Sequence, residues 1–336
     1  ALVAVGGTDI STGLPFTGKM TAPAGATVVT PITTLIDRLA AQDTDPNKDA
    51  ATKVAEAQSK LKTLLGLDAV AADLTQTDFV AQSVSGDATG EDGITDRQAA
   101  DVYAKAVQII NVVKVTQSAI KGAQGDGALT DEEISDAAFG ALVQQLNALE
   151  DAPLADGADA LTDAGFLTNV VQSTVDAQLG NAQDAKAKAD AVVSGASAIL
   201  ASANTRIEAS IDALASDATG ENALGALVDL VKVGKAAQGQ IADGISQATG
   251  SDNPEAAAGA LQQQVTQDGG AFSDDVVNAQ DVDDVDGDGQ VDILDALALA
   301  RVLKSGGPVP VGQDRDQDGA LTQNGVDLLA RSVVLL

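Results

Sequence analysis

The sequence predicts a mainly α-helical protein: an alanine-rich helical bundle, preceded by a small β element and followed by a pair of loop–helix repeats. Three observations support this class. Hydrophobic residues make up 45% of the chain but aromatic residues only 2%, which suits closely packed alanine-rich helices better than a β-sandwich core. Apolar side chains recur at helical spacing through most of the chain after residue 31. Two acidic segments near the C-terminal end share one residue spacing.

Residues 1–31 are the expected β element. Gly, Thr and Pro punctuate short β-branched runs, which indicates two or three strands with tight turns. The opening "GGTDISTGLPFTGKMTAPAGATVVTPITTLI" and its helical sequel resemble modules of very large secreted surface or adhesin proteins of marine bacteria, over about residues 1–230.

Residues 32–270 are expected to form the bundle, as one unit or as two sub-bundles that divide near residues 155–162. Asp45 and Pro46 fit a cap followed by a first-turn proline, so we expect a helix from there to about Leu65.

Two later helices are expected to begin with capping boxes, Thr95 with Gln98 and Thr130 with Glu133. Apolar stripes follow both boxes: Val102, Ala106, Ile110 and Val113 behind the first, and Ile134, Ala138, Leu142 and Leu149 behind the second. The turn "GAQGDGALTDEE" matches a calcium loop only from its fifth position, so a helix cap is favoured there.

A long alanine-rich stretch over residues 162–217 is expected to break or kink at Gly180 and Gly195. Further helices are expected near residues 220–249 and 253–267.

The most specific motif is "DVDGDGQVDILD" at residues 284–295, which has the spacing of a twelve-residue calcium loop. Gly289 stands at position 6, where the chain must turn sharply. The predicted oxygen ligands are Asp284, Asp286, Asp288, Gln290 through its backbone carbonyl, Asp292 and Asp295. Calcium takes six to eight oxygen ligands, so this pattern predicts a Ca²⁺ site; the alternative is an acidic turn without an ion.

The same frame returns in "DRDQDGALTQNG" at residues 314–325. Its predicted ligands are Asp314, Asp316, Asp318, Ala320 through its carbonyl, and Thr322. Gly325 stands at position 12, where a carboxylate is usual, and Asn324 or Asp327 would compensate only if the loop re-forms. We therefore expect a weaker second site, or an empty loop.

Two calcium loops, each followed by one helix, resemble a dockerin over about residues 274–336, and "DGDGQVDILDALALARVL" is similar to dockerin repeats. The resemblance implies Ca²⁺ as the cofactor and docking onto a cohesin-like protein. Ile293 and Leu294 stand where many cohesin-binding dockerins carry Ser and Thr, and Gly325 replaces the last ligand. The resemblance to dockerins therefore supports calcium binding by this chain more strongly than it supports cohesin binding.

Composition limits the remaining functions. The net charge of −30 makes nucleic acid and anionic membranes poor partners, and no membrane-spanning run is visible, so we expect no nucleic-acid partner and no membrane insertion. The chain has no cysteine and no histidine, so zinc sites, thiol nucleophiles and histidine triads are excluded. An acidic, calcium-binding surface suits an extracellular, secreted location. Since the first residue is alanine and no signal peptide is visible, we expect a processed chain or a piece of a longer one.

The leading prediction is a non-catalytic extracellular structural or adhesion protein that binds calcium. The apolar segments "ALVAV" and "SVVLL" suggest a homo-oligomer or a head-to-tail filament, unless each packs on its own domain. The second prediction is a dockerin-type module that attaches to a cohesin-like partner. The least favoured is a carboxylate-based secreted glycosidase, because the chain offers no Trp, one Tyr and five Phe for a sugar cleft.

Overall fold

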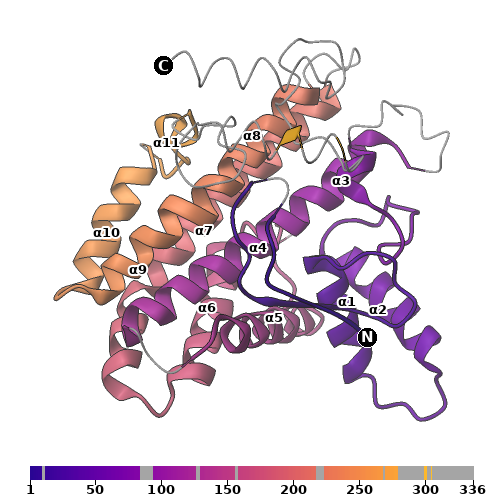
Figure 1. Ribbon diagram of the computed structural model, residues 1–336, viewed down its shortest axis with the longest axis horizontal. Coiled ribbons are helices and arrows are strands. Elements are labelled where there is room, and N and C mark those ends of the chain that lie inside the picture. The colour runs from indigo at the N-terminus through magenta and orange to yellow at the C-terminus, as the bar shows by residue number, and fades with distance from the viewer. Residues whose placement is uncertain are drawn as a thin grey trace.

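The computed structural model describes residues 1–9, 12–83, 94–125, 129–155, 158–216, 223–267, 269–278, 299–300 and 304. In this part of the chain the protein is a helical bundle accompanied by a two-stranded antiparallel sheet (Figure 1). The predicted helical bundle and N-terminal β element are therefore confirmed. The predicted pair of loop–helix repeats lies almost wholly outside the described residues.

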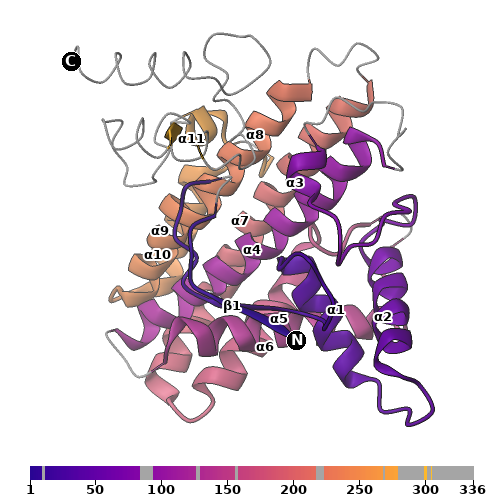
Figure 2. The same cartoon turned by 45° about the vertical axis from the view of Figure 1, so that its right-hand side comes forward.

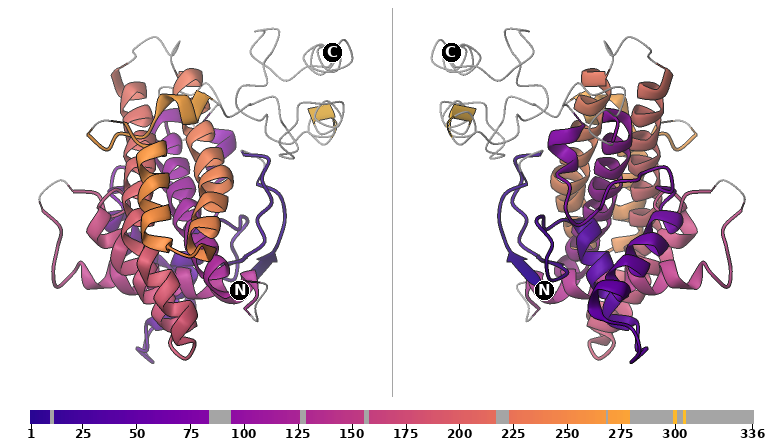
Figure 3. Two further views of the ribbon diagram at one scale, coloured as in Figure 1. Left: turned by 90° about the vertical axis from the view of Figure 1, so that its left-hand side faces the viewer. Right: turned by 90° about the vertical axis from the view of Figure 1, so that its right-hand side faces the viewer.

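The sheet consists of β1 (Leu2–Val5) and β2 (Lys19–Ala22). They pair with Leu2 opposite Ala22 and Val5 opposite Lys19, and the hairpin stands on one side of the bundle (Figure 3). β2 packs on the helices α1 and α5, so the hairpin is attached to the bundle through its second strand.

The hairpin bends directly after β1. Gly6 and Gly7 have φ angles of 65° and 133°, which side chains with a Cβ rarely adopt. The Gly6 N–H donates to the Gly18 carbonyl at 3.0 Å, but the next bond runs from the Phe16 N–H to the Gly7 carbonyl at 2.8 Å, one residue out of the β1–β2 register. A bulge of this kind ends the flat pairing, so the regular part of β1 is confined to four residues.

Three helices follow the hairpin: α1 (Pro31–Gln42), α2 (Ala50–Leu64) and α3 (Phe79–Gln82). The expected start of a helix at Pro46 is wrong, because Asp49 caps α2 by accepting a hydrogen bond from the Thr52 N–H at 2.8 Å. Asp45 instead accepts from the Asn47 N–H at 2.9 Å, which holds this segment in a turn. The expected end near Leu65 is confirmed.

Both predicted capping boxes are confirmed. Thr95 and Gln98 cap α4 (Asp96–Gln124), and Thr130 and Glu133 cap α5 (Asp131–Ala148). In each box the threonine hydroxyl accepts from the N3 backbone N–H, and the N3 side chain accepts from the threonine N–H. The two apolar stripes face the core: Val102, Ile110, Val113, Ile134, Ala138 and Leu142 are buried, and Ala106 and Leu149 are partly buried against it.

The long alanine-rich stretch forms α6 (Ala164–Leu179) and α7 (Gln183–Ser216), and the predicted break at Gly180 is confirmed. At Gly195 the helix continues instead. A Cβ on Gly195 would lie 3.2 Å from the Ala258 Cβ, so this glycine allows close packing of two helices. Sequence alone cannot separate these two uses of a helical glycine.

The last described helices are α8 (Ala223–Ala236), α9 (Ala242–Gly250), α10 (Pro254–Val265) and the short α11 (Asp274–Asn278). They confirm the helices expected near residues 220–249 and 253–267. A π-helical turn, η1 (Ala237–Ile241), joins α8 to α9 without a break, which the sequence did not indicate.

The two longest helices, α4 and α7, pack against each other and form the centre of the bundle (Figure 2). α8, α9 and α10 pack on α7, and α5 and α6 pack on α4 and on each other. One hydrophobic core runs through residues on both sides of the connection at 149–163. Within the described residues, no helix combines the length and apolar character of a membrane span.

Candidate functional site

The predicted calcium ligands lie outside the described residues. These are Asp284, Asp286, Asp288, Gln290, Asp292 and Asp295 of the first loop, and Asp314, Asp316, Asp318, Ala320 and Thr322 of the second. In the part of the chain that the structure does describe, no three acidic side chains come together as metal ligands. The calcium site therefore stays a prediction, and five other features are candidates for function: an acidic turn, a groove, a smaller cavity, a buried polar network and an exposed strand.

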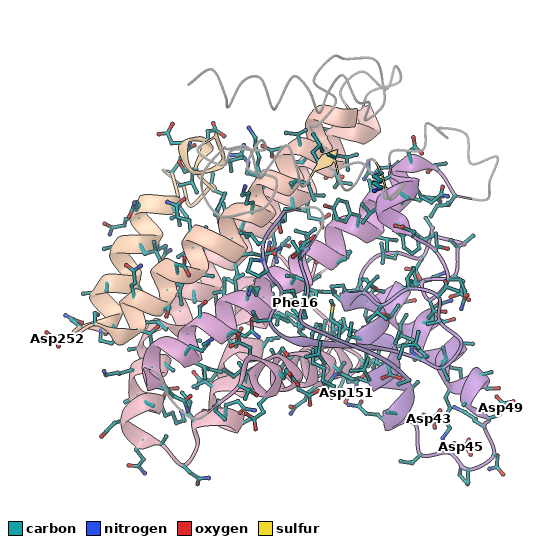
Figure 4. The ribbon with its side chains drawn as sticks, in the orientation of Figure 1. Phe16, Asp43, Asp45, Asp49, Asp151 and Asp252 are labelled. Atoms are coloured by element: carbon teal, nitrogen blue, oxygen red, sulfur yellow. The ribbon has the colours of Figure 1, made fainter. Side chains whose placement is uncertain are left out.

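The acidic turn lies between α1 and α2, where Asp43, Asp45 and Asp49 lie close to one another (Figure 4). The Lys48 ammonium is 2.9 Å from Asp43 Oδ2 and 2.5 Å from Glu56 Oε2. These bonds to Glu56 and Asp43 raise the pKa of Lys48 above its ordinary value. The turn thus carries its own cation, and alternating acidic positions alone are not enough to identify a calcium loop.

The groove, of about 840 Å³, lies between α7, α10 and the segment before α11. Arg206 of α7 lies in its wall and donates to Asp229 Oδ1 at 2.8 Å and to Asp274 Oδ1 at 2.6 Å. Burial raises the pKa of Asp229, but Arg206 and Ser210 outweigh burial, and the net pKa is lowered. A general acid at neutral pH needs a raised pKa, so Asp229 does not suit that role in a glycosidase.

A smaller cavity of about 260 Å³ lies between the hairpin and α4. Its lining is mostly apolar, with Lys114 among the polar residues. Lys114 donates to the Pro15 carbonyl at 3.2 Å, and burial lowers the pKa of its ammonium. Asp9 is the one carboxylate among the described residues of this lining, so the cavity offers no pair of carboxylates for hydrolysis.

The buried polar network crosses the centre of the bundle. Lys105 of α4, only 5% exposed, binds Asp159 and Glu208, with 2.6 Å between its Nζ and Glu208 Oε1. Burial lowers the pKa of Lys105, but the two carboxylates outweigh burial, so the net pKa is raised. A lysine that stays charged between two carboxylates is neither a nucleophile nor a base, and this network is structural.

The same network continues along α4 through amide side chains. Gln108 Nε2 donates to Glu208 Oε1 at 2.6 Å, and Asn111 Nδ2 donates to Asn204 Oδ1 at 3.2 Å. Gln238 of η1 donates to Asn111 Oδ1 at 3.2 Å. The sequence patterns did not predict these residues. The available signal was three polar residues, Lys105, Gln108 and Asn111, that recur every three positions in the otherwise apolar "VYAKAVQIINVV" of α4.

The exposed strand is β1. Leu2, Val3 and Val5 are 44%, 57% and 53% exposed, and they are the large hydrophobic residues exposed in the described part of the chain. Among the residues that the structure describes, the second edge of β1 has no strand neighbour. In contrast, the outer edge of β2 is closed: the Lys19 N–H donates to Ser135 Oγ at 2.9 Å and the Thr21 N–H to Thr34 Oγ1 at 3.0 Å.

Comparison of the chain with protein-family models, with curated proteins and with solved structures gave no match. What the fold and these features define is an acidic helical-bundle protein with a small β hairpin, whose apolar first strand has one edge without a strand neighbour among the described residues.

Proposed function

We propose that the protein is a non-catalytic, calcium-binding structural or adhesion protein that acts outside the cell and self-associates. The observation that carries this proposal is the loop at residues 284–295, in which the turn glycine and every ligand position agree with a calcium loop. The recurrence of the same residue spacing at residues 314–325 adds support, because an acidic turn that arose by chance would not be expected to occur twice with one spacing.

Calcium would act on this segment by removing repulsion among its carboxylates. Asp284, Asp286 and Asp288 bring three negative charges together at alternate positions, a cost that a divalent cation removes on binding. Calcium at a thousandfold above its Kd adds about 4 kcal/mol to stability by mass action. For a module of roughly 60 residues, a contribution of that size decides whether it folds.

The acidic surface supports an extracellular location. A net charge of −30 makes each copy repel itself and its neighbours, and dissolved cations screen this repulsion. Millimolar calcium, which extracellular calcium modules with weak sites require, is available outside cells. The non-catalytic part of the proposal rests on the sequence, which contains no histidine or cysteine and few aromatic residues.

The test is calcium titration by calorimetry on the whole chain, with light scattering on the same samples. In the first variant Asp286→Asn and Asp288→Asn together remove two ligands of the first loop. The control is Asp252→Asn, an exposed aspartate in the turn between α9 and α10 (Figure 4) that belongs to neither loop. We expect the native chain and the control to bind one or two ions, and the first variant to lose the tighter site.

A second pair of substitutions, Asp316→Asn with Asp318→Asn, separates the two loops. Because the second loop lacks a carboxylate at Gly325, we expect this variant to keep the tighter site. Equal loss in both variants would contradict the assignment of the tighter site to the first loop. Absence of any binding heat at millimolar calcium in the native chain would refute the proposal as a whole.

The dockerin-like arrangement of the two repeats supports a second candidate, attachment to a cohesin-like protein. Its test is surface immobilisation of a cohesin domain and injection of the chain with calcium and with chelator. Binding that needs calcium and is lost in the first-loop variant would favour this candidate over self-association. No binding at micromolar chain would remove it.

A further inference from the structure

We infer that β1 pairs with β1 of a second copy of this chain, so that two hairpins form one four-stranded antiparallel sheet. The inference deepens the self-association in the proposed function, but it rests on the described strand and not on calcium. Its starting point is the exposure of Leu2, Val3 and Val5 on a sheet edge that carries no strand neighbour among the described residues.

The hydrogen bonds of β2 show which backbone groups of β1 face outward. The Lys19 and Thr21 N–H groups donate to side chains on the far edge of β2, so neither residue turns its N–H toward β1. In an antiparallel pair, the N–H and C=O groups of two opposed residues either all point toward the partner strand or all point away from it. Val5 stands opposite Lys19 and Val3 opposite Thr21, so the N–H and C=O of both valines point to the open edge.

Within the described part of the chain, this edge lacks the usual protection against pairing with another chain. Natural edge strands are blunted by charged side chains, proline or a bulge. Residues 1–7 include no charged residue and no proline, and the bulge begins only at Gly6, after the strand has ended. The four-residue strand therefore combines an open backbone edge with two exposed β-branched side chains, Val3 and Val5.

A second copy of β1 fits this edge because the strand is self-complementary. With Ala4 at the centre of an antiparallel pairing, Val3 lies opposite Val5 of the second copy, and Val5 lies opposite its Val3. Each of these pairs exchanges two hydrogen bonds, so every outward N–H and C=O of both valines gains a partner. The two copies of Ala4 then stand opposite each other as a non-hydrogen-bonded pair, in which the Cα atoms approach most closely. The small side chain of alanine suits this close approach.

The charge distribution also favours contact at this strand. Two copies with a net charge of −30 each repel one another over most of their surface. β1 carries no carboxylate side chain, and the residue opposite Val5 in the sheet is the cation Lys19, whose ammonium is 3.5 Å from Asp136 Oδ1. Contact through β1 therefore brings fewer like charges together than contact through the acidic turns, and added salt should strengthen it.

The first test is the molecular mass of the whole chain by analytical ultracentrifugation over a range of concentrations, with variants at Val3. Val3→Pro removes an N–H that points outward, so it leaves the β1–β2 bonds intact but blocks the new pairing. Val3→Thr is the matched control, since it keeps the N–H and the β-branched shape. We expect a concentration-dependent dimer for the native chain and for Val3→Thr, and a monomer for Val3→Pro, all with equal circular dichroism spectra.

The second test determines the register by disulfide cross-linking. Because the chain has no cysteine of its own, a disulfide can form only between the introduced cysteines. The Cα atoms of opposed residues at a close antiparallel pair lie about 4.5 Å apart, within disulfide range. We expect Ala4→Cys to form a covalent dimer under mild oxidation at least tenfold faster than Leu2→Cys, whose two copies lie apart in this register.

Both tests are run with calcium and with chelator. A dimer that persists in chelator while calorimetry detects no calcium binding would leave this inference standing and remove the proposed function. A native chain that stays monomeric at high salt and high concentration would overturn the inference. Equal cross-linking of the two cysteine variants, or a dimer that survives Val3→Pro, would overturn it as well.

Discussion

Replacement of Lys105 by methionine tests the view that the polar network at the centre of the bundle is structural. Methionine is unbranched and almost as long as lysine, but it carries no charge. Lys105 is 5% exposed, and its ammonium binds both Asp159 and Glu208. The substitution therefore leaves two carboxylates near each other without their shared cation, in the middle of a packed interface.

The expected cost can be estimated from the burial of the residues involved. Loss of one partner from a buried ion pair costs about 3–5 kcal/mol. The side chains of Asp159 and Glu208 remain 26% and 30% exposed, so water can partly replace the ammonium, and we expect the lower end of this range, about 3 kcal/mol. With an unfolding entropy of about 2.1 cal/mol/K per residue, this lowers the Tm by roughly 4 °C.

The assay is urea unfolding at pH 7 followed by circular dichroism. The matched control is Lys121→Met, because Lys121 pairs with Asp131 at 2.6 Å but its side chain is 51% exposed. A surface pair of this kind contributes under about 1 kcal/mol. A loss for Lys105→Met below 1 kcal/mol, or no greater than that of Lys121→Met, would refute the structural interpretation of the network.

The same variant carries a pH signature. In the native chain the raised pKa of Lys105 means that its contribution is fully present below its unfolded value of 10.5, and is lost only as pH rises through the higher folded value. Stability of the native chain should thus be insensitive to Lys105 between pH 6 and pH 9. Lys105→Met lacks this contribution at every pH, so the difference in unfolding free energy between the native chain and the variant should stay constant between pH 6 and pH 9, and should shrink only as pH rises through the folded pKa of Lys105.

Three further predictions concern single contacts. Thr130→Ala removes the N-cap hydroxyl of α5 and should lower the free energy of unfolding by about 1 kcal/mol, with Thr130→Ser close to native, in the same urea assay. The lowered pKa of Asp229 stabilises the fold above its unfolded value of 3.8, and this contribution is lost as pH falls through the depressed folded value. The difference in unfolding free energy between native and Asp229→Asn should therefore be constant from pH 5 to 8 and vanish in stronger acid; a difference that grows in acid would contradict the assignment. Gly195→Val should destabilise by about 1–3 kcal/mol in thermal unfolding, because its side chain meets Ala258 of α10.

The elements that could be predicted from the sequence are those whose cause is local. The capping boxes of α4 and α5 involve residues three apart, so the sequence contained the whole interaction. The start of α2 was misplaced because two aspartates, Asp45 and Asp49, compete as caps over four residues. The turn before Asp49 also contains Lys48, whose bonds to Asp43 and Glu56 link it to the end of α1 and to α2, and the local spacing of the aspartates does not include these contacts.

The features that could not be predicted depend on distant residues. Lys105 binds partners that are 54 and 103 positions away in the sequence, and rules based on local residue spacing do not predict contacts over such separations. The open edge of β1 was anticipated only as an apolar segment, because its exposure depends on how β2 packs on the bundle. For the calcium loops the situation is reversed: the motif is explicit in the sequence, and its residues lie outside the described part of the chain.

The contact between Asn111 and Asn204 has a consequence for the alignment of the two central helices. Interfaces rich in alanine look much alike from one helical turn to the next, so small side chains alone discriminate weakly against a shift of α4 along α7 by one turn, about 5.4 Å. Such a shift would separate the two buried amides, which lie 3.2 Å apart, and leave both without their partner. The bond between these two asparagines thus favours the observed alignment of α4 and α7 over one shifted by a helical turn.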